Sequence, residues 1–148
     1  PFSSYAEGWA LYSERIAAED MGMYEDYPLG NLGRLQAEMF RAVRLVVDTG
    51  MHSKRWSRER AIDYMLSKTG MTEAEVTREI ERYVVWPGQA TAYKVGQIYM
   101  LRLRSMAEEE LGDQFDIREF HEMILMNGAM PLQILEESVT SWISSYDQ

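Results

Sequence analysis

Residues 5–14 read YAEGWALYSE, and this stretch decides what kind of helix opens the chain. On a helical wheel with about 100° per residue, one stripe is apolar and mostly aromatic: Tyr5, Trp9, Tyr12 and Ile16. Glu7 and Glu14 fall together on the opposite side of the wheel. Their neighbours there are also mostly apolar: Ala10, Leu11, Ala18 and Met21. A helix that is apolar on both sides is typically buried, so the two carboxylates need an explanation.

A buried carboxylate without a partner is costly, so a cation is expected beside Glu7 and Glu14. One candidate is an arginine in a structural ion pair, and the sequence offers three: Arg41, Arg44 and Arg82. The other candidate is a metal ion, which would need further nitrogen or oxygen ligands. The wheel alone leaves both alternatives open.

Few side chains of this chain are typical zinc ligands. It has no cysteine, and its two histidines, His52 and His121, lie far apart in the sequence. Residues 121–125 read HEMIL, which begins like the zinc motif H-E-x-x-H but ends in Leu125. The sequence alone therefore shows no complete zinc motif.

The rest of the chain predicts further helices. We expect the first helix over residues 4–21, capped by Ser3 or Ser4, and a loop over residues 22–33. The next helix, ending near residue 52, is indicated by apolar side chains at helical spacing: Leu32, Leu35, Met39, Val43 and Val46. Together with the helices below, this pattern predicts an all-α fold, a bundle of about seven helices.

Capping residues mark the later helices. Ser57 is placed to cap a helix up to Gly70, and Thr72 with Glu75 has the spacing of a capping box. Pro87 suits the first turn of a long helix that ends near residue 111. Two further helices are expected over residues 117–128 and 131–146. No internal boundary is apparent, so residues 1–148 predict a single helical unit.

The composition excludes several classes of protein. The chain has 148 residues, 46% of them hydrophobic, and a formal net charge of −9. This charge argues against nucleic acid as a partner, because nucleic-acid binding needs a basic surface. No apolar run approaches the roughly 20 residues of a transmembrane helix.

Three further residues have specific interpretations. Gly96 lies inside the long predicted helix, where glycine costs about 1 kcal/mol against alanine, so we expect it to permit close helix packing. Tyr93 is a candidate hydrogen-bond donor to a developing oxyanion, although a helical tyrosine is more commonly a core residue. His52 ends a predicted helix, where a capping or loop role is the simpler interpretation.

Four blocks of sequence resemble the DUF885 family of bacterial proteins: YAEGWALYSE, DTGMHSKRW, RYVVWPGQATAYKVG and FHEMILMNGAMPLQILEE. They occur in the right order over most of the chain. The resemblance implies a mostly helical, zincin-like metallopeptidase that hydrolyses peptide or amide bonds. It also implies that this chain is the C-terminal portion of a larger fold.

The family pattern has an H-E-x-x-P-G-H-H block before the block that contains Glu7, and the present chain, which starts at Pro1, lacks it. That block would supply two histidine ligands of zinc and the glutamate that activates water. We therefore expect this chain to be a fragment. The full-length protein would bind zinc, whereas the fragment alone would bind none and would be inactive. Self-association of the fragment is a further expectation, because the missing part would leave apolar surface near Glu7, Trp9 and Tyr93 uncovered.

The resemblance also implies roles for individual residues. Glu7 matches the third zinc ligand, and Glu14 would orient a histidine ligand. Tyr93 and His52 would donate hydrogen bonds to the oxyanion, with Gln89 beside them. Arg82 would bind a substrate carboxylate or pair with a buried acid, and His121 lies in a matching block as a fourth candidate catalytic residue.

The alternative is a non-catalytic helical module. In that reading Glu7 and Glu14 are held in buried ion pairs, and the helices form a structural or interaction surface.

Overall fold

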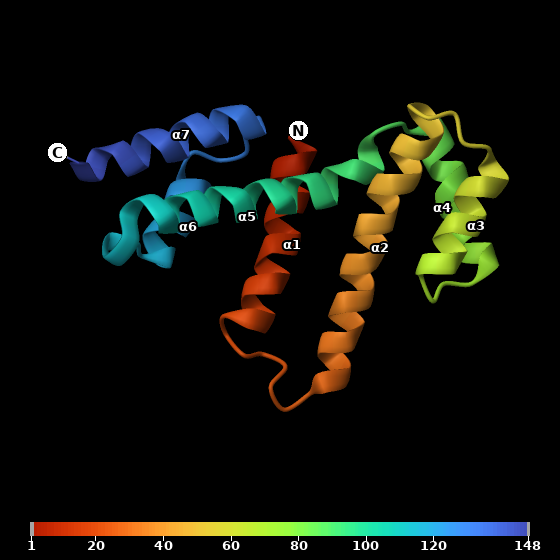
Figure 1. Cartoon of the computed structure of the whole chain (residues 1–148), viewed down its shortest axis with the longest axis horizontal. Coiled ribbons are helices and arrows are strands. Elements are labelled where there is room, and N and C mark those ends of the chain that lie inside the picture. The colour runs from red at the N-terminus through yellow and green to blue at the C-terminus, as the bar shows by residue number, and fades with distance from the viewer. Residues whose placement is uncertain (1, 148) are drawn as a thin grey trace.

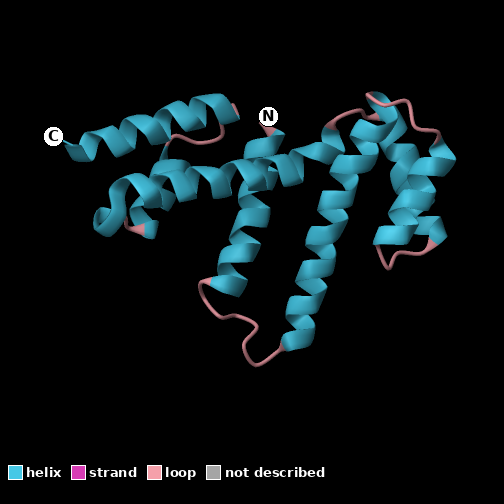
Figure 2. Cartoon of the chain, viewed as in Figure 1, coloured by secondary structure: helices cyan, strands magenta, loops and turns pink. Residues whose placement is uncertain are grey.

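The computed structural model describes residues 2–147, and over these residues the fold is entirely helical, without a β-strand (Figure 2). This confirms the predicted all-α bundle of seven α-helices. Their bounds are α1 Ser3–Glu19, α2 Pro28–His52, α3 Arg58–Lys68, α4 Glu73–Val85, α5 Ala92–Leu111, α6 Ile117–Met126 and α7 Leu132–Ser144. Three short 3-10 helices follow or precede them: η1 Gln89–Thr91, η2 Gly112–Gln114 and η3 Ser145–Asp147.

Helix α5 runs from the upper end of α2 past α1 to the far end of the molecule, and it contacts α1, α2, α7, η1 and η2 (Figure 1). Helices α1 and α2 extend from the same side of α5, run in opposite directions and are joined by a loop at their far ends. Helices α3 and α4 form a hairpin beyond α2, and α6 and α7 lie at the other end of α5. Within the described residues, no helix has the combination of length and apolar character that crossing a bilayer requires.

Helices α1 and α5 approach each other very closely where Gly8 and Gly96 face each other. A Cβ atom added to Gly8 would lie 2.4 Å from the carbonyl carbon of Gly96. A Cβ atom added to Gly96 would lie 1.9 Å from the carbonyl oxygen of Ser4. Neither distance is possible for a real side chain, so both positions require glycine. The expectation that Gly96 permits close helix packing is confirmed.

Two hydrophobic cores lie on either side of this crossing. The first joins α1, α5, α6 and α7, and its largest fully buried side chains are Tyr12, Met100, Leu103, Phe120, Ile124 and Leu135. The second joins α2, α3, α4 and η1 around Val47, Met65, Val76, Ile80 and Tyr83. The predicted apolar stripe of the first helix packs in the first core, with Tyr5 and Tyr12 buried.

The caps of two helices are as the sequence predicts. The Ser57 side chain accepts a hydrogen bond from the backbone N–H of Arg60 at the start of α3. At the start of α4, Thr72 and Glu75 form both hydrogen bonds of a capping box. Each arrangement satisfies backbone donors that a helix start leaves without a partner.

Three predicted boundaries are wrong. Helix α1 has Phe2 at its N-cap, with no side-chain cap from Ser3 or Ser4. Helix α2 begins at Pro28, inside the predicted loop, because proline is well tolerated in a first helical turn, where its missing N–H costs nothing. Helix α5 begins at Ala92 rather than near Pro87, because the intervening Gly88 has a φ of 82° and starts a turn.

The apolar face of α2 is only partly buried. Of the five side chains that mark the helix in the sequence, Val43 is buried, and Leu32, Leu35, Met39 and Val46 are exposed. The periodicity therefore predicts the helix correctly. Among the described residues, however, the second core covers only the C-terminal part of α2, around Val43 and Val47.

We expect Gly96→Ala to destabilise the protein. Alanine favours a helix over glycine by about 1 kcal/mol, but its Cβ atom would have to displace the backbone of α1. We therefore expect a net loss of at least about 1–3 kcal/mol, the usual cost of overpacking. Denaturant unfolding followed by circular dichroism measures this loss.

Gly33→Ala is the matched control, because Gly33 lies on the exposed side of α2 and its Cβ atom would meet nothing within 4 Å. That variant should gain about 0.5–1 kcal/mol. Equal gains in both variants would contradict the close crossing of α1 and α5.

Candidate functional site

Glu7 and Glu14 differ in their surroundings. Glu7, next to Gly8 at the crossing of α1 and α5, is half-buried, whereas Glu14 is exposed. Glu14 lies with Arg34 at a shallow cavity between α1 and α2. The expectation of a buried face is therefore met in part by Glu7 and is wrong for Glu14, which water can solvate.

The described residues do not form the ion pairs that the alternative function expects for Glu7 and Glu14. Among the described residues, neither Glu7 nor Glu14 has a salt bridge or side-chain hydrogen bond, and Arg41 and Arg44 pair with no carboxylate. Arg34 pairs with Glu19 and Glu38 instead. The predicted partners of Glu7 are thus engaged elsewhere or have no acid beside them.

Arg41 and Arg44 project from α2 onto the ring of Tyr93 in α5. The guanidinium carbon of Arg44 lies 4.3 Å from the centre of this ring, and that of Arg41 lies 5.0 Å from it. The ring of Phe40 is also within 5.3 Å of both guanidinium carbons. Tyr93 is half-buried, and its hydroxyl has no hydrogen-bond partner among residues 2–147. We call Arg41 and Arg44 the arginine pair.

Arg82 borders the arginine pair but has a carboxylate of its own. Its guanidinium donates to Glu79, one turn earlier in α4, at 2.7 Å. Burial tends to raise the pKa of Glu79, but hydrogen bonds from Arg82 and Tyr83 lower it overall, so Glu79 stays ionised. The sequence leaves two partners open for Arg82, a substrate carboxylate or an acid of the protein. In the structure Arg82 pairs with an acid of this chain, Glu79.

Gln89 connects Arg82 to the arginine pair. Its Oε1 atom accepts a hydrogen bond from Arg82 at 3.0 Å and a longer one from Arg44 at 3.5 Å. The sequence places Gln89 beside Tyr93, and the structure brings it to the same group through η1 rather than through the first turn of α5.

His52 lies at the last position of α2, close to this group but turned to the backbone. Its Nε2 atom is 2.9 Å from the carbonyl oxygen of Tyr83. A carbonyl oxygen only accepts, so Nε2 carries the proton and Nδ1 of the neutral ring has none. His52 can therefore donate to a second group only when its ring is protonated.

His121 belongs to a different part of the molecule. From α6, its Nε2 atom lies 2.8 Å from the hydroxyl of Tyr12, and Trp9 packs edge-on against its ring. Burial raises the pKa of Tyr12 to about 12, so its hydroxyl stays protonated. Within the described chain, the structure thus brings Tyr93, Arg82 and His52 near one another and leaves His121 in the first core.

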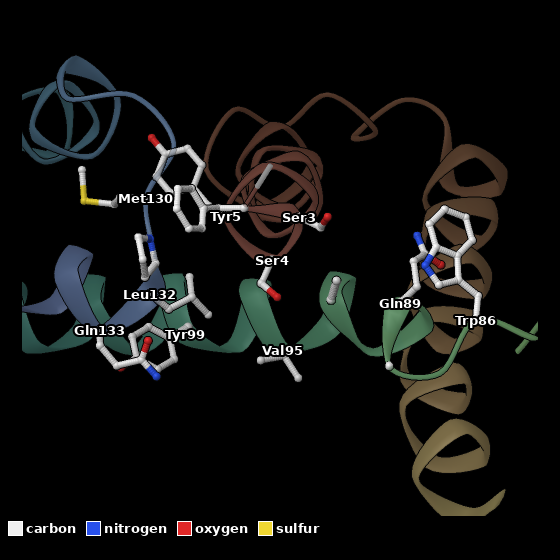
Figure 3. Close-up of a pocket in the computed structure, with 14 residues that line it drawn as sticks. Ser3, Ser4, Tyr5, Trp86, Gln89, Val95, Tyr99, Met130, Leu132 and Gln133 are labelled. Atoms are coloured by element: carbon white, nitrogen blue, oxygen red, sulfur yellow. The ribbon is translucent and has the colours of Figure 1, made fainter. Parts of the chain in front are cut away.

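A cleft of about 630 Å³ opens between the start of α1, η1 with the start of α5, and the segment before α7 (Figure 3). Gln89 and Trp86 lie at one side of it, and Tyr5 and Met130 at the other. Six predicted site residues do not line this cleft: Glu7, Glu14, His52, Arg82, Tyr93 and His121. Gln89 is the residue that the cleft and the arginine group share.

The described residues contain no group of three histidine, aspartate or glutamate side chains that could hold a metal ion together. Glu7 remains a single carboxylate on a helix that the crossing with α5 holds in place.

Comparison with known families identifies the class of protein. The family described as "Bacterial protein of unknown function (DUF885)" matches residues 1–139, and the chain belongs to this family. The expected resemblance to DUF885 is therefore confirmed.

A solved structure gives the same fold. The crystal structure of a protein from Colwellia psychrerythraea, described as a "putative lipoprotein", matches with 56% sequence identity and a TM-score of 0.94. The match covers 98% of this chain and 25% of the other one, so the chain spans about a quarter of that protein's length. No curated protein matches the sequence.

The arginine pair is the feature that sequence reasoning missed. The sequence offers Arg41 and Arg44 as ion-pair partners of Glu7, but not as two cations without an acid beside them. A local signal exists for Arg82, because Glu79 stands three residues before it on the same helix face. Glu38 has the same spacing to Arg41 but pairs with Arg34 and Lys94, and Asp48, four residues after Arg44, binds the N–H of Gly88.

The tyrosine–histidine contact predicts a pH dependence of stability. Burial lowers the pKa of His121 in the folded protein, Arg104 adds to this, and Asp20 opposes it. The unfolded chain then binds a proton more readily than the folded chain. Stability is therefore complete above the unfolded pKa of about 6.5 and falls as the pH drops through the lowered folded pKa.

We expect the free energy of unfolding to fall less steeply between about pH 7 and pH 5 in His121→Gln than in the wild type. His52→Gln is the control, because it replaces the other histidine of the chain, which lies outside the first core. Chemical unfolding at several pH values measures the slopes. Identical slopes in His121→Gln and the wild type would show that His121 is not the responsible group.

Proposed function

We propose that this chain forms part of a zinc-dependent hydrolase of peptide or amide bonds, in which Glu7 is one of the metal ligands. The observation that carries the proposal is the state of Glu7. It is a half-buried carboxylate with no cationic partner among the described residues, and it stands beside the close contact of α1 with α5. A rigidly held carboxylate that lacks a counter-ion is what a metal site requires of one ligand.

Zinc in such a site lowers the pKa of its bound water and polarises the substrate carbonyl. The residues of this chain would act around it. Glu7 would bind the metal, and Glu14, two turns further along α1, would orient a histidine ligand supplied from outside the chain. The protein from Colwellia psychrerythraea extends well beyond the quarter that this chain matches, which is consistent with further ligands in the rest of such a protein.

Tyr93 is the best-placed candidate to stabilise developing negative charge on the substrate. Its hydroxyl has no partner in the described part of the chain, and the arginine pair lies over its ring, which favours hydrogen-bond donation from the phenol. His52 is a second candidate donor, in its protonated form only, because its Nε2 proton is directed at the Tyr83 carbonyl.

The remaining candidates take other parts in the proposal. Arg82 already pairs with Glu79, so we assign it the task of orienting Gln89 towards the site. His121 contacts Tyr12 in the first core, and we assign it no part in the reaction.

The experiment is a comparison of bound zinc and peptide hydrolysis in the complete natural protein. We expect Glu7→Gln to weaken zinc binding by more than about 100-fold, the upper range for residues that only orient a ligand, and to abolish hydrolysis. Glu14→Gln should weaken zinc binding by about 10–100-fold. Both variants should change the free energy of unfolding by no more than about 0.5 kcal/mol, because neither Glu7 nor Glu14 forms an ion pair with the described residues.

Glu137→Gln is the matched control, because Glu137 is exposed on α7 and has no ion pair among the described residues. It should leave zinc content and hydrolysis unchanged. Zinc content that is unchanged in Glu7→Gln would contradict the proposed ligand, whatever happens to activity.

A further inference from the structure

Arg44 is a buried cation that forms no ion pair with the described residues, although its charge helps to lower the pKa of Glu79. Arg44 exposes 4% of its surface, and none of the carboxylates in the described chain lies within ion-pair distance of it. Its Nε atom is buried without a hydrogen-bond partner, and the same holds for the Nε atom of Arg41. A guanidinium removed from water in this way is normally compensated by an acid.

The two guanidinium groups share the same two aromatic rings. Both are stacked within 5.0 Å of the Tyr93 ring centre, and the Phe40 ring contacts both. Aromatic faces attract each cation, but they do not neutralise the charge. Two like charges in a partly dry environment therefore repel each other, and a bound anion would relieve this repulsion.

The nearby acids are occupied with other donors. Glu79 accepts hydrogen bonds from Arg82 and from the hydroxyl of Tyr83. Asp48, one turn after Arg44 on α2, is buried and accepts the backbone N–H of Gly88 with both oxygens, at 3.1 Å each. Three arginines thus surround Tyr93 and Gln89, and one carboxylate pairs with them.

We propose that Arg41 and Arg44 form a carboxylate-binding site, and that its ligand is the free C-terminal carboxylate of a peptide substrate. The planar guanidinium matches the two oxygens of a carboxylate. One more donor lies beside the same group. Gln89, whose Oε1 accepts from Arg82 and Arg44, keeps its amide hydrogens for the ligand.

The inference rests on the proposed function in one respect only, namely that the molecule which bears the carboxylate is a peptide. It narrows that function to hydrolysis near a free C-terminus. Inorganic phosphate presents similar paired oxygens, so the experiment includes it as a separate arm. Binding is measured on metal-free protein, which makes the result independent of zinc and of turnover.

The test uses the complete natural protein, stripped of metal with a chelator. Calorimetry compares an N-acetylated trialanine with a free C-terminus and the same peptide with a C-terminal amide. We expect the free acid to bind at least about tenfold more tightly, because hydrogen bonds to a charged partner are lost in the amide. Inorganic phosphate at the same concentration should compete weakly with the free acid.

Arg41→Gln is the main variant, because Arg41 is half-buried and its substitution is compatible with folding. It should remove most of the preference for the free acid, and Arg44→Gln should remove it completely if that variant folds. Arg78→Gln is the control with the same change of charge, on the exposed face of α4 and without an ion pair among the described residues. It should keep the preference.

Equal binding of acid and amide by the wild-type protein, or no measurable binding of either, would overturn the proposal. So would a preference that persists in Arg41→Gln with unchanged folding. Phosphate binding without any preference for the acid would overturn the assignment to a peptide. Loss of the preference in Arg41→Gln together with unchanged zinc content would support this site and leave the role of Glu7 as a separate question.

Discussion

The contact between Gly8 and Gly96 is the constraint on which the arrangement of functional residues depends. Side chains at either position would occupy the backbone of the other helix, so the pair sets how closely α1 and α5 approach. Glu7 is the residue before Gly8, and Tyr93 lies one turn before Gly96. The same contact therefore places a half-buried carboxylate and a half-buried phenol at one crossing. Further hydrogen bonds, from Gln97 to the Leu11 carbonyl and from Tyr5 to the Ile124 carbonyl, hold α1 in this position.

A second constraint holds α2 against the same end of α5. The buried Asp48 carboxylate binds the N–H of Gly88, whose positive φ turns the chain from α4 into η1. This turn brings Gln89 beside Arg44 and Arg82, on the edge of the 630 Å³ cleft. Asp48 thus has a structural task at Gly88, and Arg44 forms no ion pair within the described chain.

How much of this could be predicted follows from the range of each interaction. Caps such as Thr72 with Glu75 act within one helical turn, and the sequence predicts them correctly. Gly96 could be interpreted because a glycine inside a helix needs a reason, and close packing is the usual one. Periodicity shows that α2 has an apolar face but not which elements cover it, so the sequence could not predict that Leu35 and Met39 are exposed. The partners of Arg44 depend on residues about 40 positions away, and no local pattern records them.

The overall charge gives the local arginine pair a specific task. With a formal net charge of −9, the chain repels anions at long range, and at physiological salt this repulsion is screened beyond about 8 Å. A substrate carboxylate would therefore be attracted only close to a positive site. Arg82 cannot be that site on its own, since Glu79 neutralises it. The arginine pair contacts aromatic rings and forms no ion pair among the described residues, and rings stabilise a cation without cancelling its attraction for an anion. Selection for a free carboxylate follows from this contrast between an acidic chain and one partly buried pair of cations without an ion pair.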